Sequence, residues 1–170
     1  MIIYGLVASP RKGGNTDLMV DHALRGAGAE GRKIYIHELK IRPCLACSTP
    51  PSGYCVIDDD METIYQILVE ADAIILGIPV YYTSVPGPFK NLIDRCNCFR
   101  IDKQKKCLLI IVSDQSRWFR PIIRMIEIWG RDVNLTISDL IIVTNTGKNP
   151  VTDRPSILKY AQERGKRLID

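Results

Sequence analysis

Five apolar runs alternate with helix-like segments along the chain, and this alternation limits the possible fold more than any other feature. The runs span residues 2–8, 33–37, 73–79, 107–112 and 139–144. After the first run, apolar residues recur at the spacing of one helix face, namely Val20, Ala23, Leu24 and Ala27. Because parallel strands need crossover connections, the pattern predicts an α/β sheet with helices on both faces. Five strands favour a three-layer sandwich with a parallel sheet of order 2-1-3-4-5.

Acidic and proline residues mark where several helices begin. Asp59 and Glu62 have the spacing of a capping box, in which two side chains accept hydrogen bonds from the first helical N–H groups. Pro121 and Pro155 suit the first turn of a helix, where a backbone N–H is not needed. We therefore expect helices to begin near these positions.

The length and composition predict a single globular domain over residues 1–170. A chain of 170 residues is long enough for one sizeable core, and 46% hydrophobic with 25% charged residues is a globular balance. The sequence contains no linker or internal repeat. The formal net charge of +4 is spread along the chain, which argues against a nucleic-acid-binding face and favours an anionic ligand.

The sequence also predicts a cytoplasmic protein without a membrane segment. No apolar run approaches the roughly 18 residues that cross a bilayer. The apolar stretch that starts at Met1 has no basic leader, so we interpret it as a first strand rather than a signal peptide. In the cytoplasm, the six cysteines would be reduced thiols, metal ligands or redox groups.

The loop from Ser9 to Thr16 is suited to a phosphate group. Its candidate binding residues are Ser9, Arg11, Gly14, Asn15 and Thr16. Gly13 and Gly14 let the backbone turn inward, and Arg11 supplies a charge-assisted donor. A helix that begins near Thr16 would direct its free N–H groups to the same place. The alternative is an ordinary strand-to-helix turn capped by Asn15 or Thr16. The loop matches neither an ATP-binding P-loop nor a dinucleotide fingerprint.

Two further loops follow the third and fourth predicted strands, at the same edge of the sheet. Candidate ring-binding residues are Pro79, Val80, Tyr81, Tyr82 and Thr83. Adjacent tyrosines beside small polar groups suit a flat aromatic ring, although a proline-rich turn on the surface is the alternative. Ser113 begins the loop 113–116, which could close the pocket from the other side. Residues 117–119 beyond it either form a lid or pack on the last helices.

Together these motifs resemble the NADPH-dependent FMN reductase family. The shared motifs are Ser9-Pro10-Arg11 with Gly-Asn-Thr, the cysteine loop running into Asp59-Asp60-Met61, and Pro79-Val80-Tyr81-Tyr82 leading to residues 90–95. The match covers about the first 100 residues, and it is most similar to the iron–sulfur flavoproteins of that family. The resemblance implies a flavodoxin-like fold, bound FMN, and homodimers or homotetramers with flavins near subunit interfaces. By matching position, Ser9, Arg11, Asn15 and Thr16 would hold the phosphate, and residues 79–83 would line the ring.

The cysteines depart from the iron–sulfur pattern, in which four cysteines bind a [4Fe–4S] cluster. Cys44, Cys47 and Cys55 are present, but Pro50 stands where the third cysteine of the motif would be. A neighbouring subunit or an external ligand could complete a cluster. A three-thiolate zinc site, a redox dithiol and simple loop packing are the alternatives. Cys96, Cys98 and Cys107 are expected at the opposite edge of the sheet, too far away to serve.

The sequence therefore predicts an FMN-dependent oxidoreductase. Hydride from NAD(P)H would reduce the flavin, which would pass electrons to a flavin, quinone or protein acceptor. No catalytic side chain is expected, because the flavin carries the chemistry. The alternatives are an iron–sulfur flavoprotein electron carrier fed by a ferredoxin-like partner, and a non-catalytic nucleotide-binding module.

Overall fold

A five-stranded parallel sheet forms the centre of the computed structural model, which describes residues 1–28, 30–47, 55–115 and 119–168. The strands are β1 (Ile2–Val7), β2 (Glu30–Tyr35), β3 (Ala73–Pro79), β4 (Lys105–Val112) and β5 (Leu135–Val143). Their spatial order is β2-β1-β3-β4-β5, with every pair parallel. This confirms the predicted topology, and the chain reverses its winding direction between β1 and β3.

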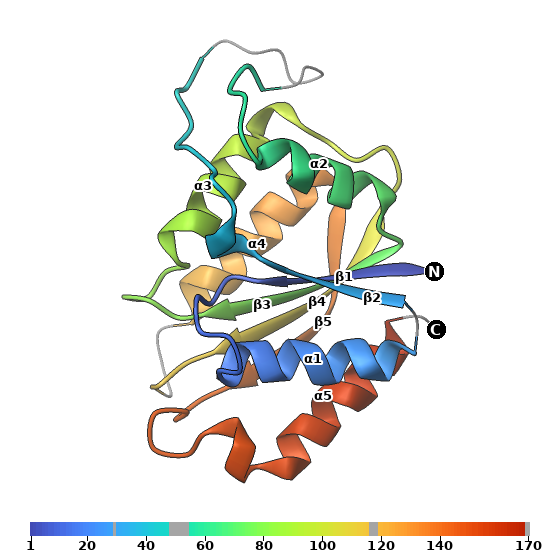
Figure 1. The fold of residues 1–170 in the computed structure, drawn as a ribbon, viewed down its shortest axis with the longest axis vertical. Coiled ribbons are helices and arrows are strands. Elements are labelled where there is room, and N and C mark those ends of the chain that lie inside the picture. The colour runs from blue at the N-terminus through green and yellow to red at the C-terminus, as the bar shows by residue number, and fades with distance from the viewer. Residues whose placement is uncertain (29, 48–54, 116–118, 169–170) are drawn as a thin grey trace.

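Helices cover both faces of the sheet (Figure 1). One layer holds α1 (Asn15–Ala27) and α5 (Pro155–Arg167), and the other holds α2 (Met61–Glu70), α3 (Gly87–Arg95) and α4 (Arg120–Val133). Three short 3₁₀ turns complete the structure, η1 (Ile36–Glu38), η2 (Cys96–Cys98) and η3 (Val151–Asp153). None of the helices in the described ranges is long and apolar enough to cross a membrane.

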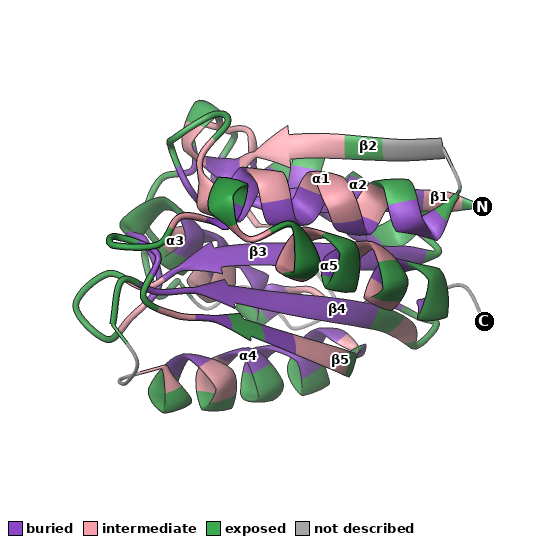
Figure 2. Cartoon of the chain, turned by 90° about the horizontal axis from the view of Figure 1, so that it is seen from below, coloured by how far each residue is buried: buried purple, intermediate pink, exposed green. Residues whose placement is uncertain are grey.

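The core lies on both sides of the central strands. Every residue of β3 is buried (Figure 2), as its nearly continuous apolar sequence predicts for a strand covered on two faces. Successive side chains alternate between the layers. Ile74 and Leu76 pack with the α2–α4 layer, whereas Ile75 and Leu108 pack with α1 and α5.

A glycine in β3 brings the first turn of α1 close to the sheet. A Cβ atom on Gly77 would lie 3.0 Å from Cγ2 of Thr16 and nearer still to Val20. Any larger residue would force the Val20 and Thr16 side chains of α1 to shift. The close approach places the N-terminus of α1 beside the end of β3, where the ligand-binding loops were predicted.

The largest boundary errors fall on the two edge strands. The structure starts β2 at Glu30 and β5 at Leu135, before the predicted starts at residues 33 and 139. An edge strand pairs on one side only, so it tolerates polar positions that an apolar run does not include. The five strands form one sheet, and a single domain over residues 1–170 stays a prediction.

Two of the predicted helix starts are confirmed and the capping box is wrong. Pro121 and Pro155 lie in the first turns of α4 and α5. Asp59 does accept the Met61 N–H at 3.1 Å, but Glu62 accepts from Gln66 within the helix rather than capping its first turn. The helix begins at Met61, so its N-cap residue is Asp60 and Asp59 lies one residue too early for the box.

Candidate functional site

A cavity of about 160 Å³ lies where β1, β3 and β4 end, toward the left of the sheet in Figure 1. Its lining residues are Ser9, Arg11, Asn15, Thr16, Pro79, Val80, Tyr81, Val112, Asp114 and Thr146. The structure thus brings most of the predicted phosphate loop and the start of the predicted ring loop to one place. Gly14, Tyr82, Thr83 and Ser113 lie next to lining residues without lining the cavity themselves.

The first turn of α1 leaves backbone donors free at this cavity. Gly14 is the N-cap residue, with no side-chain cap, so the alternative of an Asn15 or Thr16 cap is wrong. The N–H groups of Asn15 and Thr16 meet no acceptor within the described parts of the chain. Unpaired N–H groups at the positive end of a helix dipole attract anions.

Arg11 adds a cation that the fold itself does not use. Its side chain is exposed, and its guanidinium makes neither an ion pair nor a hydrogen bond to any described residue. Its backbone N–H is held by Ser9 Oγ at 3.2 Å. The loop is therefore fixed at its backbone while the charged end of Arg11 stays available to an anionic ligand.

Asn15 joins this loop to the connection between β5 and α5. Its Oδ1 atom accepts the Val151 N–H at 3.0 Å, and its Nδ2 atom lies 3.5 Å from the Thr146 carbonyl oxygen. The predicted role for Asn15 was that of a ligand donor. In the structure its side chain connects this loop to residues 146 and 151, and Asn15 also lines the cavity.

The second loop makes a tight turn beside the cavity. Tyr81 and Ser84 exchange two backbone hydrogen bonds of 2.9 Å, and the two residues between them have positive φ angles, 46° at Tyr82 and 63° at Thr83. Left-handed backbone is unfavourable for residues other than glycine, and most of all for a β-branched one. Such strain concentrates at functional sites. Tyr81 faces the cavity, whereas Tyr82 is fully exposed to solvent.

The third loop contributes Asp114 rather than the predicted Ser113. Ser113 is buried, where its Oγ atom accepts the Gln115 N–H at 3.2 Å. Asp114 lines the cavity, and the Thr146 hydroxyl lies 3.1 Å from its Oδ1 atom. Thr146 follows β5 and was missed. The signal that could have found it is topological, since the ends of all parallel strands meet at one edge of the sheet.

Part of the predicted lid cannot be placed. Residues 116–118 lie outside the described residues, and so does Pro50 in the cysteine loop. Phe119 is partly buried and packs against the core between the sheet and α4, which agrees with the packing alternative for that residue.

The cysteine loop is organised by a fully buried guanidinium at the end of α3. Arg95 donates to the Cys55 sulfur at 3.1 Å, to both Asp59 oxygens at 2.8 and 3.2 Å, and to the carbonyl oxygens of Arg42 and Ile57 at 3.1 Å each. Burial alone would raise the pKa of Asp59, but Arg95 and two backbone N–H groups outweigh it and lower the pKa to about 2.

The expected separation of the cysteines is wrong for Cys96, whereas Cys107 is buried near the start of β4, as predicted. The loop after η1 does not stay at the edge of the sheet but runs over the α2–α3 layer (Figure 1), so Cys44 and Cys96 line one surface groove. The Cys98 sulfur lies 3.8 Å from the Tyr65 hydroxyl, which donates to the Arg95 carbonyl. Burial raises the pKa of Cys96 to about 12, so its thiol stays protonated.

These residues do not fit a four-thiolate cluster. Cys44 and Cys47 are exposed, and the Cys55 sulfur accepts a hydrogen bond from Arg95. No group of three or more His, Cys, Asp or Glu side chains in the described ranges is arranged to hold a metal ion. Iron held by this chain alone has no complete ligand set here.

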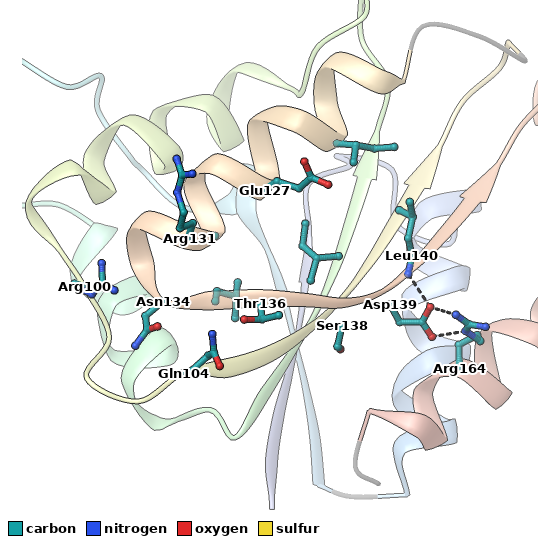
Figure 3. A pocket seen from close by; sticks show the side chains of 14 residues that line it. Arg100, Gln104, Glu127, Arg131, Asn134, Thr136, Ser138, Asp139, Leu140 and Arg164 are labelled. Carbon is teal, nitrogen blue, oxygen red and sulfur yellow. Dashed lines mark hydrogen bonds and ion pairs between the residues drawn. The ribbon is translucent and has the colours of Figure 1, made fainter.

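Two larger hollows lie away from the predicted binding loops. A groove of about 1060 Å³ runs between α3 and α4, and a depression of about 760 Å³ lies between α4 and the edge strand β5 (Figure 3). In the depression, Arg164 forms an ion pair with Asp139, and Asp139 also accepts the Leu140 N–H at 2.7 Å. The ion pair places charged side chains beside the edge strand β5, and charges there disfavour pairing with another strand.

Known proteins resemble the chain in sequence over more than half of its length. An iron–sulfur flavoprotein of Archaeoglobus fulgidus is 42% identical over 99 residues, covering 56% of this chain and 45% of that protein. An iron–sulfur flavoprotein of Methanocaldococcus jannaschii is 39% identical over 108 residues, covering 61% of this chain and 56% of that protein. The chain spans about half the length of these curated relatives.

Solved structures resemble it over the whole fold. A flavone reductase superposes with a TM-score of 0.77 at 18% identity, covering 99% of this chain and 62% of that one. An NAD(P)H:quinone oxidoreductase of Methanothermobacter marburgensis superposes with a TM-score of 0.73 at 14% identity, covering 100% of this chain and 98% of that one. At these identities the likeness establishes the flavodoxin-like fold alone.

The sequence profile of one family covers most of the chain, including the first three loops of the cavity. The profile described as NADPH-dependent FMN reductase matches residues 1–128. That range includes β1, the loop to α1, β3 and the strained turn after it. The chain therefore belongs to the NADPH-dependent FMN reductase family.

Proposed function

We propose that the chain binds FMN and transfers electrons from NAD(P)H through it to a flavin, quinone or protein acceptor. One observation carries the proposal: a single cavity joins an unpaired arginine and unpaired helix N–H groups to an aromatic loop at the switch point of the sheet. A phosphate needs the first set of groups and a flat ring needs the second.

Each loop has a distinct task in this proposal. Arg11 and the N–H groups of Asn15 and Thr16 bind the phosphate, with Ser9 and Gly14 shaping the loop. Pro79, Val80 and Tyr81 support the ring, and the turn at Tyr82 and Thr83 fixes Tyr81. Ser113 orients the third loop so that Asp114 faces the cavity. Bound FMN supplies the redox chemistry, so no side chain is assigned as acid, base or nucleophile.

The size of the cavity agrees with a partly exposed cofactor. Its volume of about 160 Å³ is below the roughly 300–1,000 Å³ typical of pockets that enclose a whole ligand. We infer that the phosphate end of FMN is enclosed while part of the ring stays accessible. Access from solvent is what a nicotinamide donor and an external acceptor both require.

Titration of the ligand-free protein with FMN and with riboflavin tests the binding step. We expect tight FMN binding, weaker riboflavin binding, and bleaching of the bound flavin by NADPH without oxygen. A protein that binds neither flavin would refute the proposal. Binding without bleaching by NADPH, but with bleaching by a reduced ferredoxin, would support the electron-carrier alternative. Binding that neither donor bleaches would support a non-catalytic module.

The names of the iron–sulfur relatives favour a second candidate, an iron–sulfur flavoprotein electron carrier, but the donor set of this chain does not. We propose that the purified protein contains FMN without stoichiometric iron or acid-labile sulfide. Anaerobic purification followed by counts of flavin, iron and sulfide per chain distinguishes the two. We also propose a cytoplasmic homodimer or homotetramer, which light scattering and cell fractionation test.

A further inference from the structure

A buried carboxylate lies directly behind the proposed phosphate loop. Asp17 belongs to the first turn of α1 and is 2% exposed, yet it does not line the cavity. A negative charge beside an anion-binding loop is unfavourable for binding unless another charge compensates it. The contacts of Asp17 show both the compensation and a use for the carboxylate.

Three donors converge on this carboxylate. Its Oδ2 atom accepts the Gly13 N–H at 2.7 Å and the Tyr35 hydroxyl at 3.0 Å, and its Oδ1 atom lies 2.7 Å from Lys33 Nζ. Burial would raise the pKa of Asp17, but these hydrogen bonds prevail and lower it, so the group stays ionised. Lys33 balances the charge and also pairs with Asp21 at 2.7 Å.

The hydrogen bond to Gly13 determines how the loop turns. Gly13 has a φ angle of +69°, a left-handed conformation that glycine adopts without steric cost. With the Gly13 N–H directed back to Asp17, the N–H groups of Asn15 and Thr16 are the unpaired ones at the cavity. Without the carboxylate, the exposed Gly13 would be free to change conformation.

A second contact holds the same loop from outside. Lys12 pairs with Glu38 at 2.5 Å, and its Nζ atom lies 4.8 Å from the centre of the Tyr35 ring. Tyr35 therefore contacts the loop through Lys12 and supports Asp17 through its hydroxyl. The end of β2, η1 and the start of α1 together fix Lys12 and Gly13 in the loop before the helix.

We propose that Asp17 is a positioning residue that holds the loop ready for phosphate, so that the chain selects phosphorylated over unphosphorylated flavin. The inference rests on the proposed FMN binding. Asp17 would act through Gly13 and would not touch the ligand. A preformed loop loses less conformational entropy on binding, which raises the affinity for the phosphate end only.

Affinities of Asp17→Ala and Asp17→Asn for FMN and riboflavin test the proposal. We expect the FMN Kd to rise about tenfold in Asp17→Ala, the size of one hydrogen bond to a charged group. Asp17→Asn keeps an oxygen for the Gly13 N–H and should lie between wild type and Asp17→Ala. The riboflavin Kd should stay within about twofold, because riboflavin has no phosphate to use the loop.

Asp21→Ala is the matched control. Asp21 lies one turn further along α1 and shares Lys33, but it makes no contact with Gly13. We expect wild-type affinity for both flavins in this variant. An equal loss of FMN and riboflavin affinity in the Asp17 variants, or an equal effect of Asp21→Ala, would overturn the positioning role. Wild-type protein that binds neither flavin would instead overturn the proposed function.

Hydrogen exchange of the Gly13 amide gives a measurement that needs no flavin. In ligand-free protein at neutral pH, Asp17 protects this amide, and we expect about tenfold faster exchange in Asp17→Asn. Asp21→Ala should leave the rate unchanged. If Asp17→Ala does not fold, the exchange rate of the Gly13 amide and the FMN Kd of Asp17→Asn still test the positioning role. An unchanged rate in Asp17→Asn together with unchanged FMN affinity would contradict the proposal.

Discussion

Arg11 and Arg95 show how one kind of side chain serves two purposes in the same molecule. Arg95 is fully buried and donates to a thiol, a carboxylate and two carbonyl oxygens. Arg11 is exposed and meets no acceptor in the described part of the chain. A guanidinium with all its acceptors inside the chain stabilises the fold, whereas one without them is available to a ligand.

The backbones around the two arginines differ in the same way. Arg95 collects carbonyl oxygens from both ends of the loop between η1 and α2, so that loop is closed by the chain itself. At the cavity, the polar groups left over are N–H donors at the start of α1. Within the described residues, the backbone acceptors at both ends of the cysteine loop thus meet a donor of the chain, whereas the cavity leaves donors that suit an anionic ligand.

Replacing Arg95 should have the largest effect. We expect Arg95→Met to lower the free energy of unfolding by about 3–5 kcal/mol, because the Asp59 carboxylate would lose its buried partner and keep only the exposed Arg42, whose Nε atom lies 3.5 Å away. Urea denaturation followed by circular dichroism measures it. Arg95→Lys should recover only part of the loss, since an ammonium cannot reach all the acceptors of the guanidinium. A loss below about 1 kcal/mol in Arg95→Met would remove the contrast with Arg11.

Replacing Arg11 should affect binding and leave stability unchanged. We expect Arg11→Gln to raise the FMN Kd about tenfold to a hundredfold, the range for a hydrogen bond to a charged group. Its free energy of unfolding should stay within about 0.5 kcal/mol of wild type, because the guanidinium has no hydrogen bond or ion pair with a described residue to lose. Arg124→Gln, an exposed arginine on α4, is the control for net charge. Equal Kd values for both variants would exclude Arg11 from the site.

Acid should weaken the Arg95 cluster only at low pH, because Asp59 keeps its charge to about pH 2. The pKa of Asp59 is lowered from its usual value near 3.8 to about 2. Its contribution to stability is therefore complete above about pH 5 and is lost as the pH falls through about 2. Asp59→Asn keeps the shape of the side chain but has no carboxyl to titrate. We therefore expect the free energy of unfolding of this variant to fall less steeply than that of wild type between about pH 4 and pH 2. Identical pH profiles would show that Asp59 and Arg95 are not coupled.

The sequence predicted the cavity better than the cysteine loop for a physical reason. Ser9, Arg11, Pro79 and Tyr81 follow buried strands, and the ends of parallel strands must meet at one edge. The path of the loop after η1 follows no such rule. It is set by Arg95, whose contacts lie 36 to 53 positions away in the chain for Asp59, Ile57, Cys55 and Arg42. Nothing in the local sequence around Cys55 indicates which distant cation will bind it.

Substitution in the turn at Tyr82 and Thr83 should have the smallest effect, but it is the most specific test of the contrast between the cavity and the Arg95 cluster. If the cavity is built for a ligand at some expense to the fold, relieving its strain should stabilise the protein and weaken binding. Left-handed backbone disfavours a non-glycine residue by about 1–2 kcal/mol. Thr83, with a φ angle of 63°, should therefore gain up to about 1 kcal/mol of stability as Thr83→Gly.

Thr152→Gly is the matched control, because Thr152 is not among the described residues with positive φ. There, glycine should destabilise the protein by about 0.5–1 kcal/mol through added freedom of the unfolded chain. In Thr83→Gly, the turn that fixes Tyr81 becomes more flexible, so FMN affinity should fall about two- to threefold while stability rises. A rise in stability together with a fall in FMN affinity would mean that the strained turn serves ligand binding rather than the fold. If stability and affinity fell together, the turn would belong to the fold, as Arg95 does.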